Sequence, residues 1–178
     1  MTLPIAQGKW TVDPSHSSLA FITKHLGFTK VRGTFSEYSV NVNVGETLET
    51  SSVEAKIELM SVSTGSADRD AHLQGADFFG ASDDPTMTFV STSISGKEDD
   101  FKITGDLTIN GKTLPVTFKA EFEGVVEDPF GNTKAGFEAK TEINRTDWGI
   151  DWNVPVGGGL LVSEKVKIEL DIQLTPAQ

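Results

Sequence analysis

Residues 101–126 read FKITGDLTINGKTLPVTFKAEFEGVV, and this stretch decides the fold class. On either side of Asn110-Gly111, apolar or small residues alternate with polar or charged ones. A period of two is typical of a β-strand with one buried and one solvated face. Asn-Gly between two such runs is a strong signal for a two-residue hairpin turn. The stretch therefore predicts two long antiparallel strands joined by a tight turn.

The same alternation returns through most of the chain. It is found in residues 53–59, 134–143 and 165–174, and also near the N-terminus in 19–25 and 40–44. About eight long strands of this kind form either a sandwich or a barrel, and closure into a barrel removes the exposed edges. Between Ser36 and Ser39 the alternation shifts by one residue, so that the inward-facing positions change, and this shift predicts a β-bulge.

One segment departs from the strand pattern. Residues 66–80 have helical composition, and we expect a short helix there with Asp68 as its cap. Leu73 and Phe79 are expected to anchor this segment against the mouth of a barrel. Since the chain contains no linker and no internal repeat, we expect one domain over residues 1–178.

Composition excludes several classes of function. The 178 residues include 15 Lys plus Arg and 26 Asp plus Glu, for a formal net charge of −11. This acidic balance argues against nucleic acid and anionic membrane surfaces as partners. There is no cysteine, so disulfides, thiolate metal sites and iron–sulfur clusters are excluded.

The N-terminus carries no recognisable targeting signal. Residues 1–8 read MTLPIAQG, with no basic n-region and no apolar h-region. No apolar run approaches the ~20 residues of a membrane-spanning helix, so we expect a soluble protein without stable membrane insertion. The expected location is cytoplasmic, or periplasmic or secreted if Met1 stands where a signal peptide was replaced.

A set of short motifs follows in order along nearly the whole chain, and in this combination resembles the YceI-like polyisoprenoid-binding family. The resemblance implies an elongated, lipocalin-like antiparallel β-barrel whose long apolar lumen takes a polyprenyl or similar lipid chain. Many members of that family are exported to the periplasm, whereas this chain shows no signal peptide. The motifs are WTVDPSHS (10–17), VRGTF (31–35), STG (63–65), RDAHL (69–73), GDLTING (105–111) and INRTDWG (143–149).

Inward parity in such a barrel selects the residues expected to line a lipid tail. A twenty-carbon chain has roughly 16 kcal/mol of gross driving force at about 0.8 kcal/mol per buried CH₂. Rigid-body and chain ordering offset about 4–15 kcal/mol of this, so net binding needs no hydrogen bond. Each lining residue could equally belong to an ordinary solid core. The expected set is Phe21, Phe35, Val42, Ile57, Phe89, Ile103, Leu107, Phe118, Phe122, Phe137, Ile143, Ile168 and Leu170.

Two inward polar residues are candidates for contact with a lipid head group. His25 has inward parity, whereas His16 is expected to shape a turn and His72 to bond locally. The spacing of the three histidines matches no metal motif, so no metal and no cofactor beyond the lipid ligand is expected. Arg145 also points inward, where it requires a carboxylate partner such as Asp147, a wet rim or a head group.

No constellation specifies catalysis. Ser15 precedes His16, but adjacent residues on a strand point to opposite faces and form no nucleophile–base pair. We therefore expect a binding protein for transport or storage of a hydrophobic lipid. Two alternatives stay open, an enzyme that acts on a lipid head group and a stress-response interaction module with a filled barrel. A homodimer is also left open, because long one-sided strands allow edge pairing.

Overall fold

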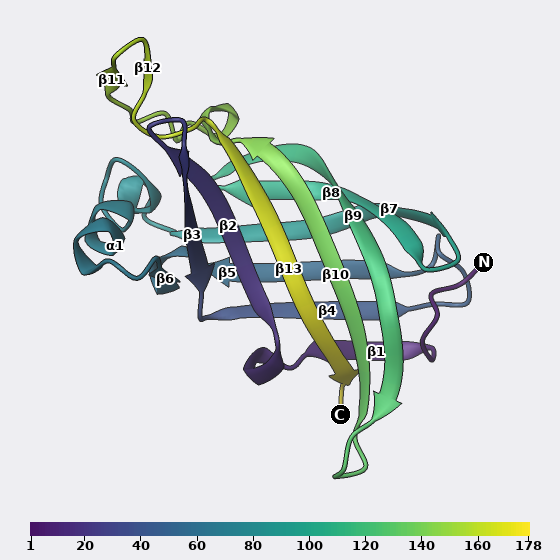
Figure 1. Cartoon of the computed structure of the whole chain (residues 1–178). Helices are drawn as coiled ribbons and strands as arrows, with labels where there is room; N and C mark the ends of the chain where they lie inside the picture. The colour runs from purple at the N-terminus through teal and green to yellow at the C-terminus, as the bar shows by residue number, and fades with distance from the viewer.

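The computed structural model describes residues Met1–Gln178, and its main feature is a closed antiparallel β-barrel (Figure 1). The C-terminal strand β13 (Lys165–Pro176) pairs with β10 (Thr133–Asn144) and, at its end, with the N-terminal strand β1 (Gly8–Val12), which closes the ring. The barrel predicted from alternation and from the family resemblance is therefore confirmed. Its eight strands, in ring order, are β1 (Gly8–Val12), β4 (Tyr38–Val44), β5 (Ser52–Glu58), β7 (Thr86–Lys97), β8 (Asp100–Ile109), β9 (Lys112–Glu127), β10 (Thr133–Asn144) and β13 (Lys165–Pro176).

Three further strands branch from β13 and widen one end of the barrel. There β13 pairs with β2 (Ser18–His25), which pairs with β3 (Thr29–Phe35), which pairs with β6 (Val62–Ser63). The short hairpin of β11 (Pro155–Val156) and β12 (Gly159–Leu160) lies at the same end (Figure 1). Short 3₁₀ turns complete the chain at η1 (Pro14–His16), η2 (Leu59–Ser61), η3 (Phe79–Ala81) and η4 (Arg145–Trp148).

The expected helix is present as α1 (Ala67–Leu73), but its cap is one we did not predict. The Ser66 side chain accepts a hydrogen bond from the Arg69 backbone N–H, so Ser66 is the N-cap and Asp68 is not. Asp68 and Asp70 lie in the first turn, where carboxylates interact favourably with the helix dipole. None of the helices is long and apolar enough to span a membrane.

The predicted bulge between Ser36 and Ser39 is wrong, because the strand breaks there altogether. β3 ends at Phe35, paired with β6, and β4 begins at Tyr38, paired with β1 and β5. The change of parity therefore marks a corner at which the chain moves between two sides of the barrel. The bulges that the structure does contain lie between Ser91 and Ser93 on β7 and at Glu123 on β9, opposite Gly136 and Phe137 of β10.

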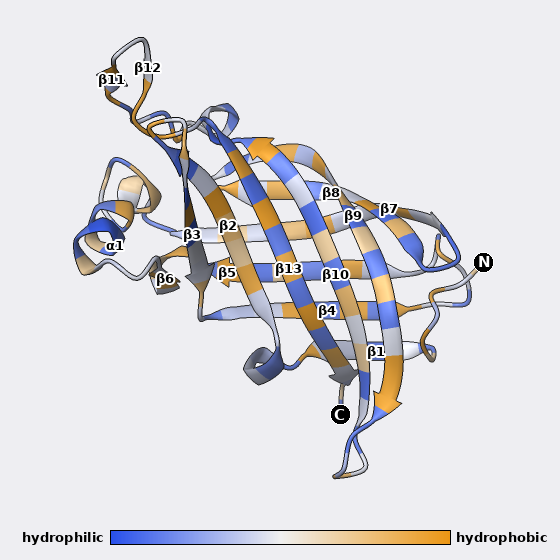
Figure 2. Cartoon of the chain, viewed as in Figure 1, coloured by the Kyte–Doolittle hydropathy of each residue, from blue (hydrophilic) through white to orange (hydrophobic).

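The interior holds two apolar clusters stacked along the barrel. One fills the end opposite α1, and its large members include Trp10, Phe101 and Val44. The other lies nearer α1 and includes Phe35, Phe89 and Phe118. Figure 2 shows hydrophobic and hydrophilic residues alternating along β13, as expected for a wall with a dry inner face and a wet outer face.

Candidate functional site

The barrel interior is not completely filled. A cavity of about 300 Å³ lies at the wide end, and 18 of its 25 lining residues are hydrophobic. A second cavity of about 80 Å³ lies deeper, and all 13 of its lining residues are hydrophobic. Leu19, Met87 and Ile168 line both, so the two cavities are neighbours that share part of their walls. Together they place apolar free space from the mouth into the barrel.

Local backbone geometry explains how the wall near the mouth is shaped. The Phe21 ring lies so close to Gly33 on the paired strand that any Cβ at Gly33 would collide with it. This close approach lets Phe21 lie against Phe35, with ring centroids 5.6 Å apart. Phe35 in turn contacts Phe79 from the helical segment at 5.9 Å. The aromatic row thus joins the sheet to the segment that borders the opening.

Most of the residues predicted to contact a lipid tail line one of the two cavities. The outer cavity is lined by Phe21, Phe35, Ile143 and Ile168, together with the predicted polar residues His25 and Arg145. The inner cavity is lined by Ile57, Phe89, Ile103, Leu107, Phe118, Ile168 and Leu170. Their contact with a ligand stays a prediction.

Three of the predicted residues, Val42, Phe122 and Phe137, line neither of these two cavities and pack with the cluster at the end opposite α1. Their contact with a ligand also stays a prediction. The Phe122 and Phe137 rings contact each other with centroids 5.2 Å apart and help to fill the barrel there. Parity places a side chain on the inner face but does not say how far along the strand the free space extends.

Several lining residues were not in the predicted set because they belong to turns or loops or lie at the ends of strands. Leu59, Phe78 and Trp152 belong to turns or loops. The Phe78-Phe79 pair within a polar segment was the one available signal. Met87 and Ile109 lie at strand ends beside the opening.

Arg145 is buried, with 5% of its surface exposed, but it has no carboxylate partner. The expected pair with Asp147 is absent, and the guanidinium donates instead to the backbone carbonyls of Ser163, Ile150 and Val162 at 3.0, 2.7 and 3.4 Å. Burial lowers the pKa of Arg145 from its usual value. The residue therefore anchors the loop around the β11–β12 hairpin and brings a positive charge to the cavity wall.

An aromatic cluster spans the mouth between the helical segment and this loop. The His72 ring meets Phe78 and Trp152 edge-on, with centroids 5.1 and 4.6 Å apart. His72 Nε2 also lies 2.9 Å from a carboxylate oxygen of Asp77, which is the local bond expected for it. Trp152 thus belongs to the aromatic cluster that borders the outer cavity.

The ionisable residues that line the outer cavity share one sign. Every one of them is basic, and the lining contains no Asp or Glu. This is the opposite of the chain as a whole, which carries a formal charge of −11. The mouth is therefore a locally basic opening in an acidic protein. The five residues are Lys24, His25, Arg69, His72 and Arg145.

Ser15 and His16 do not point to opposite faces as predicted, because both lie in the η1 turn and not on a strand. Ser15 Oγ lies 3.1 Å from His16 Nδ1 and donates to Asp13 at 2.7 Å, while Asp13 also lies 3.0 Å from the same Nδ1. A catalytic triad needs the two His nitrogens to serve Asp and Ser separately. His16 offers one nitrogen to both, as in a capped turn, which agrees with its predicted turn-shaping role.

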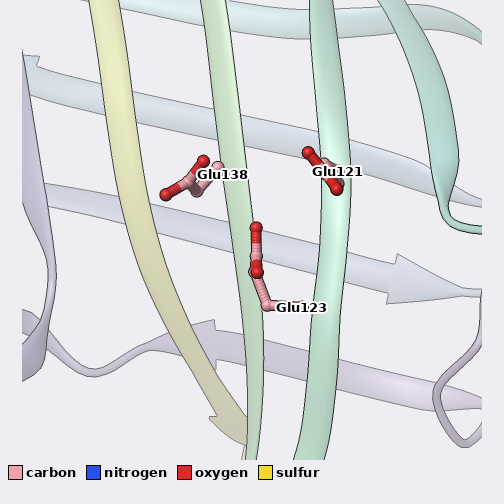
Figure 3. A group of neighbouring side chains, drawn as sticks. All are labelled: Glu121, Glu123 and Glu138. Atoms are coloured by element: carbon pink, nitrogen blue, oxygen red, sulfur yellow. The ribbon is translucent and has the colours of Figure 1, made fainter.

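Three carboxylates gather on the outer wall of the barrel, as Figure 3 shows. Glu121, Glu123 and Glu138 are exposed, and their oxygens lie within 4.8 Å of one another. Desolvation, and then repulsion from Glu138, Glu121 and Asp171, raises the pKa of Glu123. No further ligand group is directed at this cluster, so we assign no cation to it.

Comparison with known proteins places this geometry in a family. The YceI-like domain matches residues 10–174. A UPF0312 protein of Staphylococcus epidermidis is 36% identical over 171 residues, covering 94% of this chain and 97% of that protein. Protein YceI of Escherichia coli is 40% identical over 136 residues, covering 76% of this chain and 71% of that one.

Solved structures agree with the fold. BcnA of Burkholderia cenocepacia superposes with a TM-score of 0.76 at 23% identity, covering 91% of this chain and 98% of that one. A polyisoprenoid binding domain from Saccharophagus degradans gives a TM-score of 0.69 at 14% identity, covering 95% and 98%. From the domain match and the full-length relatives, the chain belongs to the YceI-like family.

Proposed function

We propose that this protein binds a long-chain isoprenoid or a similar amphiphilic lipid in its lumen, for carriage or storage. The observation that carries the proposal is the pair of adjoining apolar cavities inside an otherwise well-packed barrel. Ligand pockets commonly measure about 300–1,000 Å³, and the outer cavity reaches the lower end of that range. The structural likeness to a polyisoprenoid binding domain supports the choice of ligand class.

The physics of such a site favours an unbranched or regularly branched tail. The inner cavity has no polar lining, so it offers no hydrogen bond and stabilises apolar groups only. Each CH₂ transferred there from water contributes about 0.8 kcal/mol. Affinity would then grow with chain length until the tail reaches the closed end, where Phe122 and Phe137 fill the barrel.

The basic mouth favours a lipid whose head is anionic or rich in hydrogen-bond acceptors. His25 and Lys24 lie on the rim and are exposed, so they are free to turn toward a head group. Arg145 already donates to three carbonyls, and its contribution is chiefly its charge. A cationic head group would meet the like charges of Lys24, Arg69 and Arg145 at the cavity wall.

This arrangement suits binding better than either alternative weighed from the sequence. An interaction module with a filled barrel has no use for an internal apolar path. For an enzyme, the lumen would need a nucleophile or a general base beside the head group. Arg145 is committed to the loop carbonyls, and His25 lies on the rim, bridged to Val162. We therefore propose sequestration of the tail without a covalent step.

Calorimetric titration of delipidated protein tests this proposal. The ligands are a polyprenyl phosphate of about twenty carbons and inorganic phosphate as the matched head group without a tail. We expect saturable one-to-one binding of the lipid, with the negative heat-capacity change that marks burial of apolar surface. Equal binding of the two ligands, or no saturable uptake of the lipid, would contradict the proposal.

A further inference from the structure

Exposed apolar side chains gather around the mouth. At the tip of the β2–β3 hairpin, Phe28 is 84% exposed and Leu26 is 42% exposed. Val154 and Leu160, on the β11–β12 loop, are 41% and 39% exposed. Exposed apolar residues are ordinary when scattered singly, but a contiguous patch marks an interaction surface. Whether this group is contiguous depends on how the two hairpins are joined.

Hydrogen bonds join the two hairpins into one surface. The Leu26 N–H donates to the Leu161 carbonyl at 2.9 Å, and the Ser163 N–H donates to the Lys24 carbonyl at 3.0 Å. The Lys24 N–H donates to Ser163 Oγ at 2.9 Å. Figure 1 shows both tips at the end of the barrel where α1 lies. We call this surface the mouth platform, defined by residues 24–30 and 152–163.

The mouth platform borders the cavity directly. His25, Leu161 and Val162 belong to it and also line the outer cavity. A molecule that leaves the lumen through the mouth would therefore pass over an apolar rim. The interior of the far end is occupied by the apolar cluster that contains Trp10, Ile94 and Phe101.

The charge around the platform differs from that of the rest of the protein. Residues 14–36 contain no Asp or Glu but include Lys24, Lys30 and Arg32. The loop 152–163 contains no charged residue at all. Asp151 and Glu164 flank this loop and Arg32 is paired with Glu169, so Lys24 and Lys30 are the charges that the platform itself presents to a negatively charged surface. The net charge of the chain argues against an anionic membrane surface as a partner, but the local charge determines which face of the protein approaches that surface.

We propose that the mouth platform docks onto the surface of an anionic lipid bilayer, with Phe28 and its apolar neighbours in the interface. Aromatic and aliphatic side chains flanked by lysines are the residues that hold peripheral proteins at such interfaces. Docking in this orientation places the cavity mouth against the membrane, so a lipid enters or leaves the lumen without crossing water. This inference rests on the proposed function, since it assigns a route to the same ligand.

A second exposed aromatic residue supplies the matched control. Phe130, on the β9–β10 turn, is 88% exposed, and Figure 1 shows this turn at the lower end of the barrel, away from the platform. Acidic residues Glu127 and Asp128 precede it, so an anionic bilayer would repel this tip. Phe28 and Phe130 are thus alike in exposure and opposite in surroundings. Substitution of either leaves the core untouched.

Vesicle flotation tests the docking, with vesicles of phosphatidylcholine mixed with phosphatidylglycerol, and of phosphatidylcholine alone as the neutral comparison. Wild type is expected to float with the anionic vesicles. Phe28→Ser should weaken this binding by about tenfold or more, the factor for removing one buried aromatic side chain. Lys30→Gln should weaken it by about fivefold, while Phe130→Ser leaves it unchanged. Because Trp152 lies in the platform, the emission of each tryptophan probe is compared with that of wild type: F28W should show an additional blue shift on adding vesicles, and F130W should not.

Failure of wild type to float, equal effects of Phe28→Ser and Phe130→Ser, or a vesicle-induced shift in F130W alone would overturn the docking. The titration with soluble lipid separates this from the proposed function. If delipidated protein takes up the lipid but ignores vesicles, the lumen site stands and the docking fails. If it binds vesicles through Phe28 but takes up no lipid, the docking stands and the lumen proposal fails.

Discussion

Ala139 offers a way to shorten the lumen without disturbing the wall. Its side chain lines the inner cavity, and Leu at this position would add three carbon atoms to a space of about 80 Å³. At roughly 30 Å³ for each water-sized group, three groups fill that space. Filling an existing void is expected to stabilise the empty protein by about 0.5–2 kcal/mol.

The same substitution should weaken the binding of long tails. Three methylene groups excluded from the inner cavity cost about 2.4 kcal/mol, or about sixtyfold in affinity. A lipid whose tail is too short to reach the inner cavity should bind wild type and Ala139→Leu equally well, and this series is the internal control. Urea unfolding measures the first effect and calorimetric titration with lipids of increasing chain length measures the second.

Ala139→Leu is expected to raise the stability of the empty protein and to lower its affinity for long tails, so either measurement can refute the prediction. If Ala139→Leu destabilises the protein, the void is not available to a side chain. If the variant gains stability but binds long and short tails as wild type does, the tail does not occupy the inner cavity. Either result would break the link between the cavity and the ligand.

Three further predictions concern charges in the barrel. Arg145→Met leaves three loop carbonyls without a donor and should cost about 2–4 kcal/mol in urea unfolding, with faster hydrogen exchange in the loop. A loss under about 0.5 kcal/mol would show that the anchor is dispensable. Asp13→Asn removes the carboxylate that Lys134 contacts at 2.9 Å, and should cost about 1–2 kcal/mol at pH 7. The hydrogen bond from Ser15, then those from Lys134 and His16, hold the pKa of Asp13 well below its usual 3.8, so its stabilisation is present above pH 3.8. The difference between wild type and variant should therefore shrink as the pH falls below 3.8 toward the folded-state pKa, and a constant difference would contradict it. Glu123→Gln should raise the melting temperature at pH 7, because the raised pKa of Glu123 means that its ionisation opposes folding. This gain should vanish below pH 4.5, where the carboxyl is protonated in both states, and a gain that persists there would have another cause.

Alternation predicted the strands well because each wall segment has one dry and one wet face. The run around Asn110-Gly111 became β8 and β9 joined by the expected tight turn, with Asn110 at φ 51° and Gly111 at φ 79°. The break at Ser36-Glu37 was misread because a bulge and a corner both shift parity by one residue. Pairing partners, which no single sequence reveals, distinguish the two cases.

The site was less predictable than the fold for a physical reason. The alternation identified which side chains of the wall face the interior. The extent of the cavity depends instead on how aromatic rings pack, as Phe122 and Phe137 do at the end opposite α1. The mouth is built from loops, and Arg145 shows the difficulty there. Its partners are backbone carbonyls of residues 150–163, which have no sequence signature, so the expected carboxylate was the wrong partner.

Native mass spectrometry of the purified protein, followed by organic extraction, tests the central claim most directly. We predict a mass increment that corresponds to one long-chain lipid per protein molecule, retained under gentle ionisation and recovered in the extract. Ala139→Leu should retain a shorter chain or less of it. Protein that carries no lipid, and acquires none after incubation with polyprenyl phosphate, would contradict the claim that the lumen is a lipid-binding site.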